Sequence, residues 1–273
     1  MTEDSLHYDG TLAVIGGGRM GEAIVGGLVR SGAVAAASIT VAEPSAQRRE
    51  ALTAAFGVRC VANGAEALPA DTVILAVKPQ VIDAVAAALS SRLADSVVVS
   101  IAVGITCARL EAALPSGTAV VRVMPNTPAL VSEGMSVISG GTEASAEQTE
   151  LVRALFASLG KSIVLEERYQ DAAGAISGSG PAYFALVVDA LARGGVRQGL
   201  PRDVAQALAV QTMLGTARLL ETTGMHPEAL VDGVTSPGGT TIAAVEALEA
   251  RAVRSAFAEA VAAAVHRSKE LGS

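Results

Sequence analysis

The chain has few cysteines and histidines among its 273 residues, and each shortage excludes a kind of site. Its two cysteines, Cys60 and Cys107, lie far apart and outside any CxxC spacing, which argues against a disulfide scaffold or a zinc site. The three histidines, His7, His226 and His266, are too scattered for a metal site or a catalytic triad. We therefore expect no metal centre, and a reducing compartment.

Positive charge and long hydrophobic runs are also scarce. A net charge of -7 and a pI near 5.1 leave no basic stripe of the kind that binds phosphate backbones, so we expect no nucleic-acid partner. Apolar stretches such as "PAYFALVVDALA" end at charges before the roughly 18 residues that a membrane span needs. The polar, acidic first ten residues lack the features of a signal peptide. We interpret residues 1–10 as a loose tail, and we expect a cytoplasmic protein with no membrane partner.

Strand-like and helix-like segments alternate through residues 11–167. Short apolar runs bounded by turn residues predict strands near 11–15, 38–44, 58–61, 72–77, 96–103, 118–125, 134–140 and 161–167. Most of these runs are separated by segments with helical spacing, which is typical of parallel strands joined by crossover helices. We therefore predict a doubly wound α/β sheet for residues 11–167.

The remaining residues, 168–273, show no strand alternation. Every apolar run after Tyr169 has helical spacing, and Ala, Val and Leu occupy more than one face of the predicted helices. One copy of the chain does not normally hide so much apolar surface in a helical bundle. We therefore predict an all-helical C-terminal domain that mediates a dimer or a larger assembly.

The segment "VIGGGRMG" places Gly16, Gly18 and Gly21 in the G-x-G-x-x-G spacing between the first predicted strand and the first helix. In a dinucleotide-binding domain the first glycine makes a tight turn, the second lets the pyrophosphate approach, and the third allows close packing of the helix. Arg19 and Met20 stand inside the same loop, at the helix N-terminus where an anion is favoured. The pattern predicts a Rossmann-type domain that binds a nicotinamide dinucleotide.

The second predicted strand ends at Glu43, about two dozen residues after the glycine loop. A carboxylate at this point accepts hydrogen bonds from an unphosphorylated ribose and repels a 2′-phosphate, which favours NAD. Ser45, Arg48 and Arg49 follow at once, and arginines here can instead bind a 2′-phosphate. From the residues alone, the choice between NAD and NADP stays open.

Two further strand ends carry residues that we expect near the cofactor. "ILAVKPQ" ends a buried strand with Lys78 and Pro79, and ligands of open α/β sheets lie beyond the carboxyl ends of the strands. "MPNTP", at 124–128, follows another strand and can wall the nicotinamide pocket, although a rigid Pro-Asn turn explains it equally well.

Five motifs taken together, "GGGRMG", "AVKPQ", "MPNTP", "SGSGPAY" and "DGVTSPGGTT", resemble pyrroline-5-carboxylate reductase, and the resemblance extends from Thr11 over nearly the whole chain. It implies an enzyme that reduces a cyclic imine carboxylate to L-proline with NADPH, or with NADH. It also implies a Rossmann domain, a helical domain that interlocks with a partner's into a dimer, and a larger assembly of dimers such as a decamer. The site would lie between one subunit's cofactor and a neighbour's helices.

The resemblance also assigns roles to single residues. The glycine loop and "AVKP" would contact the dinucleotide, Asn63 would lie on the ribose side, and "SIAVG" would line the nicotinamide side. Glu167 is similar to a substrate-site acid of the family, and "SPGGTT" would form the substrate loop. The cofactor set is Gly16, Gly18, Arg19, Met20, Gly21, Glu43, Ser45, Asn63, Ala76, Val77, Lys78, Pro79, Ala102 and Val103, and the substrate set is Glu167, Val234, Ser236, Gly238, Gly239, Thr240 and Thr241.

The substrate loop suits an anionic cyclic imine. Its glycines allow backbone N–H groups to converge on a carboxylate at a helix N-terminus, and its hydroxyls can bond the ring nitrogen. We expect Thr241 to face that nitrogen and to act as the catalytic residue, with positioning rather than acid–base chemistry carrying most of the rate. Spacing alone favours an ordinary helix cap built from Ser, Thr, Pro and Gly, and it is the family resemblance that favours a substrate loop.

The sequence departs from the family pattern at two positions, and two other functions are alternatives. Gly233 stands where several members carry Asn or Gln, and Glu43 replaces the small or polar residue of NADP-preferring members. A β-hydroxyacid dehydrogenase shares the layout, but its family needs a lysine in the helical domain, and residues 162–268 contain none. A non-catalytic dinucleotide-binding sensor is the other alternative.

Overall fold

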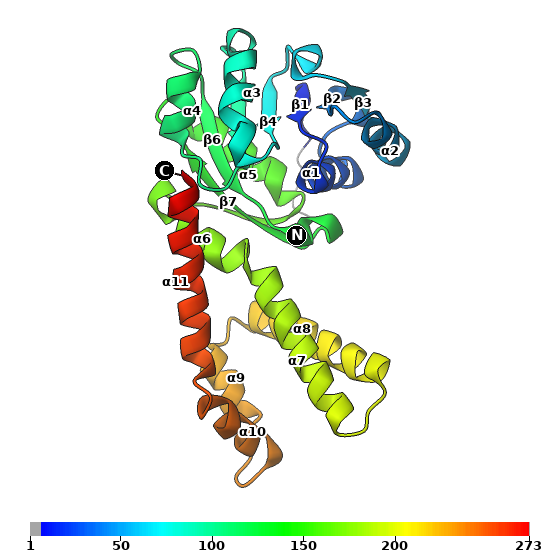
Figure 1. Ribbon diagram of the computed structural model, residues 1–273, viewed down its shortest axis with the longest axis vertical. Coiled ribbons are helices and arrows are strands. Elements are labelled where there is room, and N and C mark those ends of the chain that lie inside the picture. Colours follow the sequence, from blue (N-terminus) through cyan, green and yellow to red (C-terminus); the bar gives the residue numbers. More distant parts are fainter. Residues whose placement is uncertain (1–6, 273) are drawn as a thin grey trace. The chain divides into compact units, whose positions relative to one another are not determined.

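The structure is a computed structural model that describes residues 7–272, and the chain forms two compact units (Figure 1). One unit contains the residues up to 179 and those from 264 onward, and the other contains residues 180–263. The boundary therefore lies about a dozen residues after the 167/168 division expected from the sequence, and the end of the chain belongs to the first unit.

The first unit is built on one eight-stranded sheet with the order β3-β2-β1-β4-β5-β6-β7-β8. Its strands are β1 Leu12–Ile15, β2 Ile39–Ala42, β3 Arg59–Val61, β4 Thr72–Leu75, β5 Val97–Ser100, β6 Val120–Met124, β7 Gly134–Gly140 and β8 Gly160–Val164. The order reverses beside β1, which is the switch point of a doubly wound sheet. The prediction of a Rossmann-type α/β domain is thus confirmed.

One strand pair departs from the predicted parallel pattern, because β7 runs antiparallel to β6. The connection between them, residues 125–133, holds only the 3-10 turn Thr127–Val131. A parallel return needs a crossover of a dozen or more residues, so this connection is too short for one. Every other neighbouring pair in the sheet is parallel.

The chain between and after the strands forms helices, whose bounds are α1 Arg19–Arg30, α2 Ala46–Phe56, α3 Ile82–Leu89, α4 Cys107–Ala113, α5 Ala146–Ala157, α6 Gln170–Ser177, α7 Gly180–Arg197, α8 Arg202–Thr223, α9 Pro227–Gly233, α10 Thr240–Glu249 and α11 Val253–Gly272. Strand side chains alternate between the two faces of the sheet. One face packs against α1, α2 and α5, and the other packs against α3 and α4.

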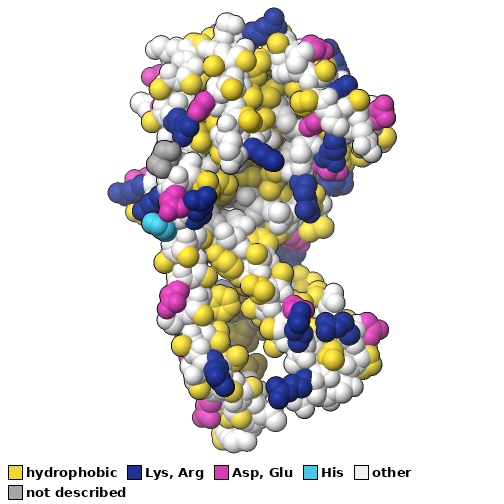
Figure 2. All heavy atoms as spheres, viewed as in Figure 1, with side chains coloured by type: hydrophobic (Ala, Val, Ile, Leu, Met, Phe, Trp, Pro, Cys, Tyr) yellow, Lys and Arg dark blue, Asp and Glu magenta, His cyan; other side chains and the backbone are white. Residues whose placement is uncertain are grey.

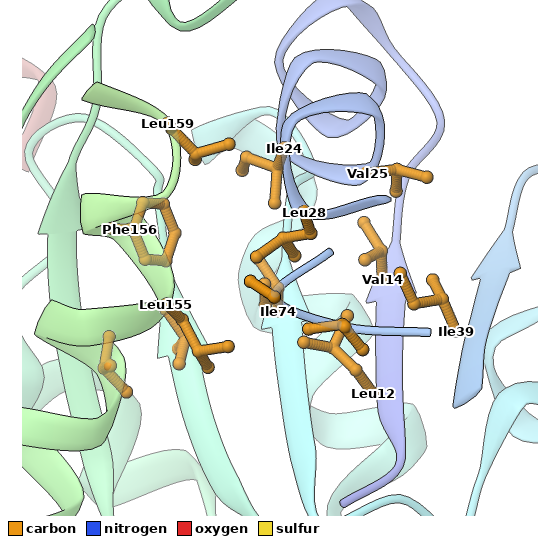
Figure 3. Packing of buried hydrophobic residues seen from close by; sticks show 14 of the residues in the cluster. Leu12, Val14, Ile24, Val25, Leu28, Ile39, Ile74, Leu155, Phe156 and Leu159 are labelled. Atoms are coloured by element: carbon orange, nitrogen blue, oxygen red, sulfur yellow. The ribbon is translucent and has the colours of Figure 1, made fainter. Parts of the chain in front are cut away.

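The core of the first face shows how this alternation is used (Figure 3). Leu12 and Val14 of β1 point to α1, whose Ile24 and Leu28 are fully buried against them. Phe156 of α5 closes the same layer. Ala13 and Ile15, the intervening residues of β1, belong to the core of the opposite face. Two buried faces explain why the central strands are apolar at every position rather than at every second one.

Helix α6 explains why the unit boundary lies later than predicted. Its first residue, Gln170, is fully buried and donates from Nε2 to the Val137 carbonyl at 3.1 Å and to Ser139 Oγ at 2.9 Å, so it anchors α6 on β7. The last turns of α11 are tied to α6 by Ser268, whose hydroxyl donates to Asp171 Oδ1 at 2.9 Å. Sequence spacing shows that these segments are helical, but it does not show where they pack.

The second unit is entirely helical, as predicted. Helices α7 and α8 form an antiparallel hairpin around a turn at Gly199, which has φ +96°. The last predicted helix, from Thr240 onward, is divided into α10 and α11 at Ala252, which has φ +53°. Helix α9 was not expected from the sequence.

Many large apolar side chains of the helical unit are exposed in the single chain, and Figure 2 shows hydrophobic side chains across its surface. Phe184 and Leu186 of α7 are 59% and 69% exposed, and Leu208 of α8 is 55% exposed. The helical run Glu167–Arg197 is also long and apolar enough to cross a membrane by length and composition alone, with only 17% of its most apolar window buried. An interface helix passes the same test.

The expectation of a loose tail at residues 1–10 is wrong for its last part, while residues 1–6 lie outside the described chain. Tyr8 is buried, forms a bridge with Val34 and donates from its backbone N–H to the Ala33 carbonyl. Its hydroxyl shares a buried 2.8 Å hydrogen bond with Thr72 Oγ1 at the start of β4. The residues around Tyr8 in the sequence are polar and acidic, so the sequence did not indicate that this aromatic side chain packs into the core.

Replacing Tyr8 tests this anchoring. Tyr8→Phe should lower the free energy of unfolding by about 1 kcal/mol, because Thr72 loses its buried partner. Tyr8→Ala should lower it by about 3–5 kcal/mol, because a cavity is added. Chemical denaturation at one fixed protomer concentration measures both values. Two unchanged stabilities would show that residue 8 is not part of the core.

Candidate functional site

The glycine loop, residues 16–18, connects β1 to α1 at the carboxyl edge of the sheet. Gly16 has φ +113°, and a Cβ atom there would lie 2.5 Å from the Ala76 carbonyl oxygen. A Cβ atom on Gly21 would collide with the Gly16 carbonyl oxygen. Two of the three predicted glycines are therefore required by the fold itself, because backbone passes close to both of them.

Gly18 is different, because nothing lies within 4 Å of the place where its Cβ would be. It is the N-cap residue of α1 and provides no side-chain cap for the first N–H groups of this helix. A helix N-terminus with free N–H groups and room in front of it fits a pyrophosphate. This arrangement is the structural observation that fits a bound dinucleotide.

Glu43 follows β2 and reaches back to the glycine loop. Its Oε2 accepts from the Gly17 N–H at 3.0 Å, and its Oε1 accepts from the Ser45 N–H at 2.9 Å. The Ser45 hydroxyl caps α2 by accepting from the Arg48 N–H at 3.4 Å. The acidic residue predicted for the ribose therefore lies beside the predicted pyrophosphate loop.

A pocket of about 270 Å³ opens at this edge of the sheet, between the strand ends and α3. Gly16, Asn63 and Val77 line it, so three predicted cofactor residues from separate segments are brought together. The Asn63 side chain already caps the turn Gly64–Ala67, with Oδ1 accepting from the Glu66 N–H. Lys78 is exposed and begins the turn Pro79–Val81.

A second pocket, of about 340 Å³, lies beside the start of α1. Met20 and Val103, both predicted for the cofactor, line it together with residues 124–127 of the "MPNTP" motif. Ala102, which was also predicted, is buried next to Val103. Asp171, Arg267 and Ser268 line the same pocket and were missed by sequence reasoning. No local motif marks α6 or the end of α11 as part of a pocket.

Glu167, which the sequence predicts for the substrate site, takes part in a buried ion-pair network. Arg122 of β6 is almost fully buried, and it forms ion pairs with Glu167 Oε1 at 3.3 Å and with Asp171 Oδ1 at 3.1 Å. The same Glu167 oxygen accepts from the Cys107 N–H, at the start of α4, at 2.8 Å. A buried guanidinium is strongly destabilising without such partners. Glu167 thus neutralises Arg122 and does not line the 340 Å³ pocket.

The same surroundings keep Cys107 unreactive. Burial, with the negative charge of Glu167 beside it, raises the pKa of the Cys107 thiol to about 12. The thiolate is the reactive form of cysteine, so this thiol is no candidate for a nucleophile.

Among residues 7–272, no three His, Cys, Asp or Glu side chains gather in a way that could hold a metal ion.

The predicted substrate loop lies in the helical unit, between α9 and α10. The Gly239 N–H donates to the Ser236 carbonyl at 3.0 Å, with Pro237 and Gly238 (φ +67°) between them, which is the pattern of a type II turn. Gly239 is the N-cap of α10 and provides no side-chain hydrogen bond. Among the described residues, no side-chain hydrogen bond involves Ser236, Thr240 or Thr241, so these hydroxyls do not cap α10, whose N-cap position is held by Gly239.

A doubly wound sheet with an open glycine loop, followed by a helical unit, defines a dinucleotide-dependent oxidoreductase. A family profile described as NADP oxidoreductase coenzyme F420-dependent matches residues 11–104, and one described as pyrroline-5-carboxylate reductase dimerisation matches residues 167–271. The chain is 45% identical to the pyrroline-5-carboxylate reductase of Synechocystis over 96% of its length and 98% of the relative's. It therefore belongs to the pyrroline-5-carboxylate reductase family.

Relatives from distant organisms and solved structures agree. The Arabidopsis thaliana pyrroline-5-carboxylate reductase is 44% identical over 94% of both chains. The structure of the Coxiella burnetii enzyme has a TM-score of 0.90 at 35% identity and covers 97% of this chain and all of that one. A Plasmodium falciparum pyrroline carboxylate reductase with NADP bound has the same TM-score at 29% identity, over 98% of this chain. These comparisons give no support to a β-hydroxyacid dehydrogenase or to a non-catalytic sensor.

Paired glycine substitutions separate folding from binding at the loop. Gly16→Ala should destabilise the protein by about 1–3 kcal/mol, because the new methyl group meets the Ala76 carbonyl at a positive φ. Gly18→Ala should leave the thermal midpoint nearly unchanged and weaken dinucleotide binding about tenfold or more, because its methyl group occupies only the space for the pyrophosphate. Thermal unfolding and fluorescence titration with reduced cofactor measure the two effects. Unchanged affinity in Gly18→Ala would contradict this position for the dinucleotide.

Proposed function

We propose that this protein catalyses the NAD(P)H-dependent reduction of 1-pyrroline-5-carboxylate to L-proline, with "SPGGTT" as the substrate loop. The observation that carries the assignment of the loop is the uncapped N-terminus of α10 behind the turn of residues 236–239. Family membership supports the reaction itself.

The loop matches the two polar groups of the substrate. The first N–H groups of α10 and the favourable end of its dipole attract the carboxylate. The hydroxyls of Ser236, Thr240 and Thr241 lie beside these N–H groups and have no other side-chain partner in the described chain. Thr241, which is half-buried, is the residue we assign to the ring nitrogen.

The protein contributes to this reaction mainly by positioning the substrate against the cofactor. A bound reduced nicotinamide supplies the hydride. A protonated imine is already an electrophile, so holding its carbon about 3–3.5 Å from the donor supplies most of the acceleration. The Thr241 hydroxyl has a high intrinsic pKa, so it is not an acid: it accepts a hydrogen bond from the N–H of the protonated imine, and after hydride transfer it can relay the proton that the amine nitrogen takes up. This explains why the loop contains no histidine, lysine or carboxylate.

The helical unit supports a homo-oligomer. The family profile that matches it is described as a dimerisation region. The apolar side chains of α7 and α8 that are exposed in the single chain are favourable only if another surface buries them. Specific assemblies bury such surfaces between identical chains. We further propose that dimers associate into a larger ring, with a decamer as the candidate size, and that the protein works in the cytoplasm.

We also propose that each active site is shared, with the cofactor loop of one chain facing the substrate loop of its partner. In this arrangement a single chain contains one cofactor loop and one substrate loop, but the two loops belong to different active sites. The dimer is then a catalytic requirement as well as a way to cover apolar surface.

Substitution of Thr241 tests the role of the loop. Thr241→Val keeps the shape and removes the hydroxyl, so kcat should fall by about 100-fold, while the affinity for reduced cofactor stays unchanged. Thr241→Ser keeps the hydroxyl and should stay within roughly threefold of the wild-type rate. Initial rates of cofactor oxidation with the imine give both values. Equal rates for the two variants would remove Thr241 from the mechanism.

Hybrid dimers test the sharing of the site. Co-expression of Gly18→Ala and Thr241→Val chains under separate affinity tags yields hybrids in which one of the two sites is intact if the sites are shared. Activity of the purified hybrid should then recover to about half that of the wild type. Each variant alone is the control. Hybrids as inactive as the single variants would show that each chain completes its own site.

A further inference from the structure

We propose that Glu43 makes this chain select NADH over NADPH, because hydrogen bonds from the glycine loop fix its carboxylate at the ribose position. The inference rests on the reductase function proposed above and concerns the same dinucleotide site. It resolves the choice that the sequence leaves open between Glu43, which disfavours a 2′-phosphate, and Arg48 and Arg49, which could bind one.

The Glu43 carboxylate is held at both oxygens. The Gly17 N–H donates to Oε2 at 3.0 Å, and the Ser45 N–H donates to Oε1 at 2.9 Å. Gly17 is buried, and a Cβ atom there would lie only 3.0 Å from Glu43 Cβ, so the side chain packs directly on the loop. Both anchors are backbone groups and cannot rotate away. The negative charge is therefore fixed beside the phosphate-binding turn.

A carboxylate in this position discriminates between the two riboses. Each of its oxygens keeps a lone pair that can accept from a ribose 2′- or 3′-hydroxyl, and such charge-assisted hydrogen bonds are strong. A 2′-phosphate offers no donor when ionised, and it places about two negative charges next to the fixed one. Both effects favour the unphosphorylated cofactor.

Arg48 does not shift the preference toward the 2′-phosphorylated cofactor, because its guanidinium is already bound by the glycine loop. Nη2 donates to the Gly17 carbonyl at 2.5 Å and to Glu22 Oε2 at 2.9 Å, and Nε donates to the same carbonyl at 3.2 Å. Its positive charge is therefore paired with Glu22 of α1. Reaching a 2′-phosphate would require breaking these contacts.

Arg49 is engaged as well. Its Nη1 donates to the Glu43 carbonyl at 2.8 Å and to the Pro44 carbonyl at 2.7 Å, so it braces the turn that presents Glu43. Arg48 is thus paired with Glu22, and Arg49 is held by two backbone carbonyls. Neither guanidinium can receive a 2′-phosphate without giving up these contacts.

The test measures cofactor binding separately from turnover. Dissociation constants of NADH and NADPH are determined by fluorescence titration of the full-length protein, without substrate, for wild type, Glu43→Ser and Glu43→Gln. Glu50→Gln is the matched control, because it removes the same charge from an exposed position of α2 that has no role in the site. Circular dichroism confirms that each variant is folded, and Glu43→Gln replaces Glu43→Ser if the latter is not.

We expect wild type to bind NADH at least roughly tenfold more tightly than NADPH. The ratio of the two constants should move toward NADPH by about tenfold or more in either Glu43 variant. Glu50→Gln should keep the wild-type ratio. A wild type that binds NADPH as tightly as NADH, or a ratio that the Glu43 variants leave unchanged, would overturn the inference.

Parallel rates with the imine separate this inference from the reductase proposal. Turnover with both cofactors, with NADPH bound more tightly, would overturn only the role of Glu43. Tight binding of NADH with no oxidation in the presence of the imine would overturn the proposed function and leave the selection by Glu43 intact.

Discussion

The close passage of Gly16 beside the Ala76 carbonyl is the constraint on which the rest of the site depends. β1 and β4 lie parallel and in register, with Ile15 opposite Leu75, so their carboxyl ends leave the sheet together. The chain must turn at Gly16 with a positive φ to avoid the neighbouring backbone, and α1 then starts with its N-terminus at the sheet edge. Gly17 consequently presents its N–H to Glu43, and Gly18 leaves open space in front of the helix. The phosphate binding and the ribose selection that we propose both depend on this one turn.

A second constraint is the buried charge of Arg122, which determines how the end of the Rossmann-type unit is organised. Burial of a guanidinium is tolerated because Glu167 and Asp171 neutralise it, and Ser268 completes the arrangement by donating to Asp171. Residues from β6, α6 and α11 are thereby held around the same 340 Å³ pocket that Met20 and Val103 line. Here the ion pairs position the walls of a pocket, and Glu167 holds Arg122, while its contact with substrate stays a prediction.

The sequence predicts the features that local chemistry decides, and it does not predict those that depend on long-range packing. The strands, the glycine loop and the acidic residue after β2 follow from periodicity and spacing, and the structure confirms the fold class. The burial of Tyr8, the antiparallel β7 and the break at Ala252 were not predicted, because each depends on a neighbour distant in sequence or on one strained dihedral angle. Asp171 and Ser268 meet across 97 positions of the chain, a separation that no local motif reports. The roles of Asn63, Lys78 and Thr241 toward ligands stay predictions.

The most direct measurement follows the hydride itself. The protein is incubated with 1-pyrroline-5-carboxylate and reduced nicotinamide carrying deuterium at the transferred position of C4, and the product is analysed by NMR and mass spectrometry. Our account predicts L-proline with one deuterium at C5, formed in a one-to-one ratio with the oxidised cofactor. Oxidation of the cofactor without labelled proline, or binding of both ligands without any oxidation, would contradict it.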